Sequence, residues 1–176
     1  MTADPLTARA RDIRLLTCDV DGVLTDGRIY LSDDGRETKA FCALDGVGIR
    51  MLQAAGVTVA WITGSNAPVV ALRARSLGVA LVVQGAEDKL APWEKLRAEL
   101  DVAPSRCAHI GDDLPDLPVL ERCGLALTVP HAPAALIERA HYVTRRDGGF
   151  GAVREACELI LAAKEPTPSR RADLDL

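Results

Sequence analysis

Short aliphatic segments alternate with segments of helical periodicity along most of this 176-residue chain. The aliphatic segments, which we expect to be strands, cover residues 13–18, 57–62, 80–83, 107–110, 125–128 and 141–143. The segments with helical periodicity are 47–55, 68–77, 88–100, 115–123, 133–139 and 152–163. Alternation of this kind, with short connections, predicts an α/β fold in which helices flank a parallel sheet. Ligands are then expected at the carboxyl ends of the strands.

One segment, residues 28–42, interrupts the alternation. Two short runs flank Asp34-Gly35, a dipeptide typical of the tight turn of a β-hairpin. The hairpin follows the first strand directly, where a βαβ unit would place its helix. Because a two-stranded ribbon is marginally stable alone, we expect it to project and to pack against another subunit or over the functional site.

The length suits one domain with a single core. We place that domain at residues 13–164. Residues 1–12 are polar and irregular in pattern, so we expect them to form an N-terminal extension. Residues 165–176 are expected to be a disordered tail.

Composition and charge exclude several classes of function. Aromatic residues make up only 3% of the chain, so the core must be mainly aliphatic, as in buried parallel strands. The net charge is −4 and Lys and Arg form no dense run, so nucleic acid is not an expected partner. The five cysteines are scattered without a C-x-x-C pair, which indicates reduced thiols. No apolar run is long enough to span a membrane, and we expect a cytoplasmic protein with no membrane partner.

The first strand ends in a pair of carboxylates, Asp19 and Asp21, followed by Gly22. Residues spaced by two point to the same side of an extended chain. Two adjacent carboxylates raise each other's pKa, and a divalent cation would remove that cost for one of them. The other, kept partly protonated, suits general acid catalysis. A lone pair of this kind is also compatible with turn formation or helix capping.

A hydroxyl and a cation recur at later junctions between strands and helices. The second strand runs into Thr63-Gly64 and opens a helix, where a hydroxyl and free backbone N–H groups can bind an anion. Lys89 falls in the first turn of the helix expected at 88–100, where the helix dipole disfavours a cation. Its position suggests that Lys89 pairs with an anionic group elsewhere in the protein or in a ligand. Taken alone, Thr63 could equally be a helix cap.

A second acidic motif follows the strand at 107–110. It reads Gly111-Asp112-Asp113-Leu114-Pro115-Asp116, which again places carboxylates at the carboxyl end of a strand. Capping of the next helix would explain such residues singly. The ordered set of acidic pair, Thr-Gly, Lys and acidic cluster makes plain capping a poor explanation.

This order of motifs resembles the haloacid dehalogenase-like superfamily over nearly the whole chain, from residue 13 to about 163. The resemblance implies a Rossmann-like fold and a phosphatase that forms an aspartyl phosphate. It implies Asp19 as the nucleophile, Asp21 as the acid and base, and Thr63 and Lys89 as ligands of the phosphoryl group. Asp19, the backbone carbonyl of Asp21, and Asp112 would hold Mg²⁺. Asp113 and Asp116 would support them.

The intervals between motifs leave no room for the cap domain that most members carry, so the chain resembles the capless class. The hairpin, the segment 45–49 and the segment 148–155 are similar to the 3-deoxy-D-manno-octulosonate 8-phosphate phosphatase family. That resemblance implies a phosphorylated sugar acid as substrate and a homotetramer assembled through the hairpins. The glycine-rich stretch at 148–151 would help to close a neighbour's site.

Two positions depart from the family pattern: Ser65 and Leu44 stand where arginines are usual. Both arginines would face an anionic sugar, so the departures leave the substrate open, with a nonulosonate 9-phosphate or another small phosphomonoester as alternatives. Ser65 and Asn66, together with Gly64, remain expected substrate contacts. Arg50, Arg145 and Arg154 are candidates to replace the missing charges. Of these three, we expect Arg154 to bind the substrate.

Two other classes of protein compete with a phosphatase. A phospho-accepting receiver module also combines Asp, Mg²⁺, Thr and Lys. In a receiver, however, an acidic pair ends the first strand and the phosphorylated Asp stands alone on a later strand. Here the Asp19-x-Asp21 motif comes first and the acidic cluster comes last, which favours a phosphatase. A catalytically silent scaffold would keep the fold without the chemistry. The complete set of Asp19, Asp21, Thr63, Lys89 and Asp112 argues against it.

Overall fold

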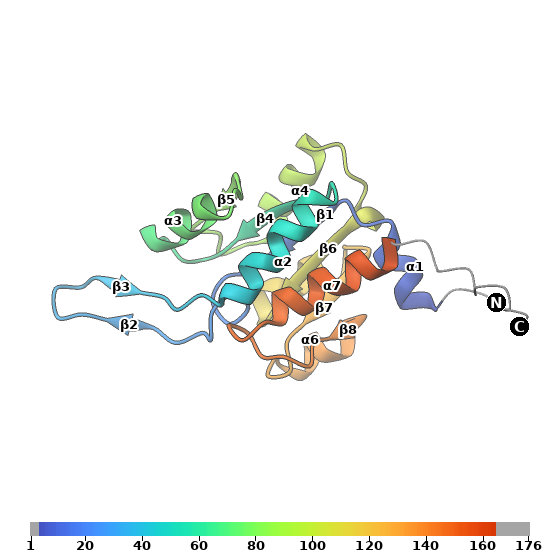
Figure 1. Cartoon of the computed structure of the whole chain (residues 1–176). Helices are drawn as coiled ribbons and strands as arrows, with labels where there is room; N and C mark the ends of the chain where they lie inside the picture. The colour runs from blue at the N-terminus through green and yellow to red at the C-terminus, as the bar shows by residue number, and fades with distance from the viewer. Residues whose placement is uncertain (1–3, 165–176) are drawn as a thin grey trace, which may run out of the picture.

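The computed structural model describes residues 4–164, so the tail predicted to be disordered lies outside the described residues. A six-stranded parallel sheet forms the centre of the molecule, in the order β5-β4-β1-β6-β7-β8 (Figure 1). Its strands are β1 (Leu15–Cys18), β4 (Thr58–Ile62), β5 (Leu81–Val83), β6 (Cys107–Gly111), β7 (Leu125–Thr128) and β8 (Tyr142–Val143). Each lies within one or two residues of its predicted bounds.

The strand order reverses next to β1. The chain runs outward from β1 through β4 to β5, then returns to form β6 on the other side of β1. Loops that leave β1 and β6 therefore diverge, which opens a crevice at their carboxyl ends. The register pairs Cys18 with both Trp61 and Ile110, so the residues that follow β1, β4 and β6 lie at one level of the sheet edge.

Helices cover both faces of the sheet. They are α1 (Pro5–Arg11), α2 (Ala43–Ala54), α3 (Pro68–Ser76), α4 (Leu90–Glu99), α5 (Leu117–Leu120), α6 (Ala134–Arg139) and α7 (Ala152–Lys164), with 3₁₀ turns at Pro104–Arg106 and Leu114–Asp116. Helices α2 and α7 pack side by side on one face, and α1 packs against α7 (Figure 1). Because parallel crossovers are right-handed, the return of the chain from β5 puts α4, α5 and α6 on the other face.

Three expectations about helices are corrected. Residues 4–11 are not irregular: Asp4 caps α1, whose Ala10 is buried. Helix α2 begins at Ala43 rather than at residue 47, and Gly46 lies inside it. A Cβ on Gly46 would approach the Leu77 side chain to 2.9 Å, so this glycine permits close packing of helices and does not break one. The helix expected at 115–123 is shorter and follows a 3₁₀ turn.

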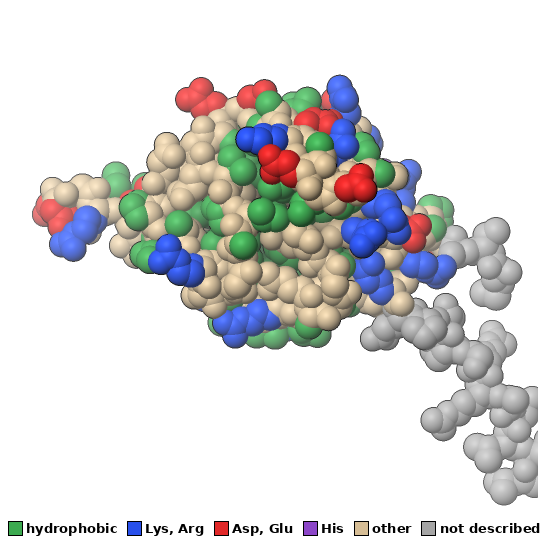
Figure 2. Space-filling model, turned by 90° about the horizontal axis from the view of Figure 1, so that it is seen from above, with side chains coloured by type: hydrophobic (Ala, Val, Ile, Leu, Met, Phe, Trp, Pro, Cys, Tyr) green, Lys and Arg blue, Asp and Glu red, His purple; other side chains and the backbone are tan. Residues whose placement is uncertain are grey.

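The predicted hairpin is present and projects from the body of the molecule (Figures 1 and 2). Its strands, β2 (Tyr30–Leu31) and β3 (Glu37–Thr38), are shorter than predicted. Gly35 supplies the positive φ of +79° that the turn requires. Ile29 and Leu31 are 68% and 69% exposed, so the hairpin carries apolar side chains that the described chain does not cover.

The core is mainly aliphatic, as the low aromatic content predicts, with Trp61 and Trp93 fully buried in it. All five cysteines are free thiols and four of them are buried. Among residues 4–164, no helix combines the length and the apolar character needed to cross a bilayer.

Candidate active site

The predicted catalytic residues line one cavity of about 280 Å³ at the carboxyl ends of β1, β4 and β6. The cavity is bounded by Asp19, Asp21, Thr63, Gly64, Ser65, Ala86, Glu87, Lys89, Asp112, Asp113, Pro115 and Asp116. Most of the sequence-predicted site residues are in this set, and they come from four separate segments of the chain. The reversal of strand order beside β1 brings them together.

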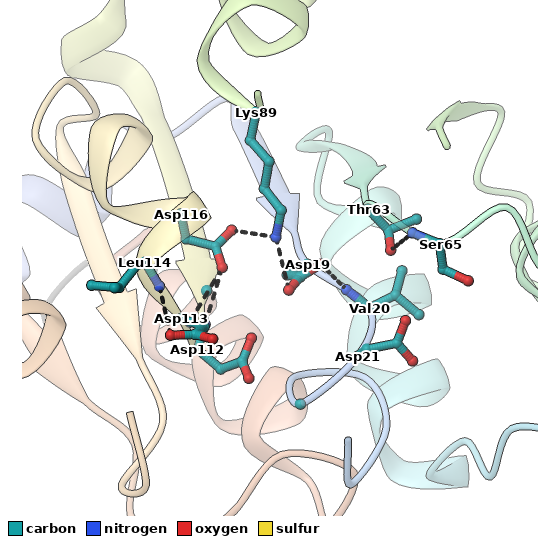
Figure 3. Close-up of polar contacts among 12 residues, drawn as sticks. Asp19, Val20, Asp21, Thr63, Ser65, Lys89, Asp112, Asp113, Leu114 and Asp116 are labelled. Atoms are coloured by element: carbon teal, nitrogen blue, oxygen red, sulfur yellow. Dashed lines mark hydrogen bonds and ion pairs between the residues drawn. The ribbon is translucent and has the colours of Figure 1, made fainter. Parts of the chain in front are cut away.

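Lys89 connects the two acidic motifs. Its Nζ lies 2.8 Å from Asp19 Oδ2 and 2.8 Å from Asp116 Oδ1 (Figure 3). The residue precedes α4 as its N-cap rather than lying in the first turn. Burial alone would lower the pKa of Lys89, but the two carboxylates raise it above the ordinary lysine value. Lys89 is therefore a buried ammonium held by two anions, which is the partnership inferred from its unfavourable place at a helix start.

Asp116 is fully buried and accepts four hydrogen bonds. Lys89 and His109 donate to Oδ1, at 2.8 and 2.9 Å, while the backbone N–H groups of Asp112 and Asp113 approach Oδ2 at 3.3 and 3.4 Å. Burial raises the pKa of Asp116, yet the hydrogen bond from His109 and the charge of Lys89 hold it below the ordinary value. Asp116 thus orders the loop that carries Asp112.

Asp19 and Asp112 place two carboxylates close together. Burial and the charge of Asp116 raise the pKa of Asp19, with Lys89 opposing. Burial and the nearby Asp19 raise the pKa of Asp112 to about 8. Such excess negative charge fits a divalent cation. Oxygens of Asp19, Asp112 and Asp116 lie within 4.8 Å of one another, and carboxylate oxygens are the donors that Mg²⁺ prefers.

These contacts separate the roles of the three carboxylates. All four contacts to Asp116 come from hydrogen-bond donors, so its oxygens are already engaged. Asp19 has one donor on each oxygen rather than two, so Asp19 and Asp112 are the side chains with lone pairs left to hold a cation. The backbone carbonyl of Asp21 stays a predicted ligand.

Asp21 does not lie beside Asp19 as an extended chain would place it. The chain turns directly after Asp19, because the Val20 carbonyl accepts hydrogen bonds from Leu24 and Thr25. The Asp21 carboxylate is directed away from Lys89 (Figure 3) and pairs with a lysine of the hairpin segment. Both aspartates still line the cavity, so a substrate could meet them on different sides.

That lysine is Lys39, whose Nζ lies 2.5 Å from Asp21 Oδ1. The sequence motifs do not single it out, although it belongs to the hairpin segment that resembles the family. Its side chain is 2% exposed and its Nζ also pairs with Glu37. Burial would lower the pKa of Lys39, but these hydrogen-bonded carboxylates raise it above the ordinary value. A lysine from the base of the hairpin therefore orients the predicted acid.

Thr63 is buried at the end of β4 and accepts a hydrogen bond from the Ser65 N–H at 3.1 Å. Its own hydroxyl hydrogen remains available to the cavity. Gln84, which the sequence motifs do not single out, donates to the carbonyls of Ser65 and Ala67 at 3.2 and 3.0 Å. This amide fixes the loop that follows Thr63.

The structure does not bring Asn66 or Arg154 to the cavity. Asn66 is exposed, and Arg154 lies on α7, where its Nε donates to Glu158 at 2.6 Å. Arg50 donates to a backbone carbonyl, and Arg145 donates to a carboxylate. Within the described chain none of these arginines lines the cavity. The structure of the single chain therefore does not support substrate contacts by them.

A second cavity of about 370 Å³ adjoins the first and shares Asp112 with it. Asp26 and His131 are among its lining residues. The glycine-rich segment packs against the loop that carries Asp21: a Cβ on Gly148 would lie 1.7 Å from the Gly22 carbonyl oxygen. The absence of a side chain at 148 therefore allows the two loops to meet.

Comparison with known proteins gives a consistent family. Residues 46–124 match the family model described as haloacid dehalogenase-like hydrolase. The chain is 49% identical over 163 residues to 3-deoxy-D-manno-octulosonate 8-phosphate phosphatase of Yersinia pestis, and the match covers 93% of this chain and 87% of that protein. It is 48% identical over 157 residues to the same-named phosphatase of Escherichia coli K12, covering 89% and 84%.

A solved structure shares the fold throughout. The phosphatase of that name from Moraxella catarrhalis, in complex with a magnesium ion, a phosphate ion and a KDO molecule, superposes with a TM-score of 0.90. It is 41% identical, and the match covers 93% of this chain and 94% of that one.

Proposed function

Since this chain belongs to the haloacid dehalogenase-like hydrolases, in their 3-deoxy-D-manno-octulosonate 8-phosphate phosphatase family, we propose that it hydrolyses that sugar acid phosphate with Mg²⁺. The products are the free sugar acid and inorganic phosphate. The observation that carries the proposal is the ion pair of Asp19 with Lys89 inside a cavity that also exposes Asp112. The reaction needs a carboxylate nucleophile, a cation for the phosphoryl oxygens and a metal site in one place.

Asp19 is the proposed nucleophile. Its Oδ1 accepts the Val20 N–H at 2.7 Å and its Oδ2 pairs with Lys89, so the carboxylate is held in one orientation. Attack on phosphorus forms an aspartyl phosphate and breaks the ester bond. Lys89 and the Thr63 hydroxyl bind the non-bridging oxygens. Asp19 and Asp112 would hold Mg²⁺, which would supply positive charge to neutralise the phosphoryl oxygens.

Asp21 is the proposed general acid and base. It donates a proton to the leaving alkoxide, and its carboxylate then accepts a proton from the water that hydrolyses the aspartyl phosphate. Lys39 holds it on the side of the cavity nearest the hairpin. Asp21 therefore lies apart from the contact between Asp116 and Lys89, which supports its proposed role at the leaving group.

The identity of the sugar acid rests on the relatives. The phosphatases of Yersinia pestis and Escherichia coli are named for 3-deoxy-D-manno-octulosonate 8-phosphate, and the Moraxella catarrhalis structure contains KDO, phosphate and magnesium. Ser65 and Leu44 lack the charges usual in the family, so a nonulosonate 9-phosphate is the alternative substrate.

We also propose that the protein is a cytoplasmic homotetramer assembled through the hairpin. The exposed apolar residues Ile29 and Leu31 would be covered in such an assembly. A neighbouring subunit would then supply arginines to the cavity, in which Lys89 is the lining cation within the described part of one chain. The free thiols suit a reducing compartment.

The test is phosphate release from a panel of sugar acid phosphates, with wild type and an Asp19→Asn variant in Mg²⁺. We expect turnover by wild type, loss after EDTA and recovery with Mg²⁺. The Asp19→Asn variant should be inactive because an amide is a poor nucleophile, while Asp101→Asn, at an exposed position, should match wild type. Equal turnover by the Asp19→Asn variant, or turnover unaffected by EDTA, would contradict the mechanism. An inactive wild type would favour a scaffold.

A further inference from the structure

His109 is a fully buried histidine in the central strand β6, and the mechanism above gives it no role. It is one of three histidines in the chain. It lies two residues before Gly111-Asp112, and both of its ring nitrogens have a partner. A buried imidazole with two partners next to a catalytic lysine could be a core residue only, or it could hold the site in its working geometry.

The two hydrogen bonds fix the ring at both ends. Nε2 lies 2.9 Å from Asp116 Oδ1, and Nδ1 lies 2.8 Å from Thr17 Oγ1. An ionised carboxylate can only accept, so Nε2 carries a hydrogen whether the ring is neutral or charged. The Thr17 hydroxyl can donate to Nδ1 or to the Ala108 carbonyl at 3.1 Å, and it fits either state. The orientation of the ring therefore does not depend on its charge.

Thr17 belongs to β1, the strand that ends immediately before the nucleophile. The chain of contacts runs from Thr17 through His109, Asp116 and Lys89 back to Asp19. Every member is buried, and the most exposed of them, Asp19, shows only 6% of its surface to solvent. The network thus closes a ring between two neighbouring strands, and water has little access to replace a lost contact.

The donor from His109 shares an oxygen with Lys89. Asp116 Oδ1 accepts from both groups, while Oδ2 accepts from two backbone N–H groups. Without the imidazole N–H, Lys89 would be the only partner of the buried Oδ1 among residues 4–164. The ammonium would then be drawn toward Asp116 and away from Asp19 and the phosphoryl position. Removing one donor leaves a buried carboxylate under-satisfied, which is costly.

We propose that His109 is a positioning residue that acts through Asp116 to set the place of the Lys89 ammonium. The inference rests on the proposed phosphatase function. It predicts an effect on the chemical step, because Lys89 meets charge that develops in the transition state. Substrate binding through the sugar, which His109 and Asp116 are not proposed to contact, should change little.

The main test compares His109→Leu with His109→Gln. Leucine has no donor, whereas the glutamine amide can place an N–H near the position of Nε2. We expect the His109→Leu variant to lower kcat by about 10- to 100-fold, as losses of supporting contacts to catalytic groups do, with KM nearly unchanged. The His109→Gln variant should recover most of that loss.

Two outcomes of this comparison would overturn the proposal. One is a folded His109→Leu variant with the kcat of wild type. The other is a folded His109→Gln variant that is as impaired as the leucine variant, because restoring the donor would then have restored nothing.

Thr17→Val gives a second route if the His109→Leu variant does not fold. It removes the hydroxyl that anchors Nδ1 but leaves the donor to Asp116, so a smaller loss in kcat of about threefold to tenfold is expected. His141→Leu is the matched control: its Nδ1 accepts the Ala126 N–H at 2.9 Å, outside the network around Asp116, and kcat should not change. Unchanged kcat in the Thr17→Val variant, or a loss in His141→Leu equal to that in His109→Leu, would contradict the proposal.

Two further measurements test this inference, and the first of them does not depend on phosphatase activity. In ¹⁵N NMR of the metal-free protein, His109 should show an Nε2–H that exchanges slowly and is absent from the His109→Gln variant. A fast-exchanging or missing Nε2–H overturns the inference even if the enzyme is active. In a Lys89→Met background, adding His109→Leu should cause no further loss of residual activity, and a full additional loss would show that His109 does not act through Lys89. If wild type lacks phosphatase activity, the proposed function fails while the NMR result still stands.

Discussion

The Asp112 carboxylate lowers the stability of the metal-free protein, and replacing it with asparagine should remove this destabilisation. Burial, followed by the charge of Asp19, raises the pKa of Asp112 to about 8 from the ordinary 3.8. The folded protein therefore keeps a proton on Asp112 that the unfolded chain loses as pH rises from about 4. By linkage, the stability associated with this group is greatest below pH 3.8 and declines up to about pH 8.

The magnitude follows from the same pKa. At pH 7 the solution is about 3 pH units above the ordinary value, and each unit corresponds to about 1.4 kcal/mol. The cost at pH 7 is therefore about 4 kcal/mol, against about 1.5 kcal/mol at pH 5. These values are upper bounds because the neighbouring Asp19 shares the repulsion. Asp112→Asn removes the titrating group and should stabilise the metal-free fold, more at pH 7 than at pH 5.

Urea unfolding of EDTA-treated proteins at both pH values measures the gain. Adding Mg²⁺ should stabilise wild type, because the cation neutralises the two neighbouring carboxylates, and it should stabilise the Asp112→Asn variant far less. Asp113→Asn is the matched control, since Asp113 is exposed and asparagine can still accept the Leu114 N–H. Its stability should stay within about 0.5 kcal/mol of wild type. The electrostatic argument would be refuted if Asp112→Asn did not raise the free energy of unfolding, or raised it equally at pH 5 and pH 7.

Two further predictions concern parts of the molecule outside the cavity. Burial raises the pKa of Asp45 to about 6, although backbone N–H groups of Arg154, Gly151 and Val153 oppose the shift. The free energy of unfolding should therefore fall by up to about 3 kcal/mol between about pH 4 and pH 6. In denaturant titrations, Asp45→Asn should reduce this dependence on pH. An unchanged dependence in that variant would contradict the prediction. Leu31→Asp places a charge on an apolar residue that is 69% exposed on the hairpin. In light scattering after size exclusion it should yield a smaller assembly than wild type, and an unchanged mass would argue against assembly through the hairpin.

The order of elements is predictable because buried parallel strands and amphipathic helices have distinct hydrophobic periods. All six sheet strands and the hairpin lie within a few residues of their predicted places. The start of α2 does not, since Asp45-Gly46 resembles a turn locally. The close packing of Leu77 on Gly46 favours a residue without a side chain at this place in the helix. Helix α1 escapes prediction because its short polar segment is stabilised mainly by packing against α7.

Within the site, the sequence determined the chemical inventory: carboxylates, a hydroxyl and a lysine at the ends of strands, in an order that a known family shares. Only the tertiary structure decided which of these groups meet. It turned Asp21 toward Lys39, engaged both oxygens of Asp116 with donors, and brought His109 and Thr17 into the network around Lys89. Sequence motifs record residues near one another in the chain, whereas these contacts join segments up to 92 residues apart. Their formation depends on the strand order of the folded sheet, which no local pattern encodes.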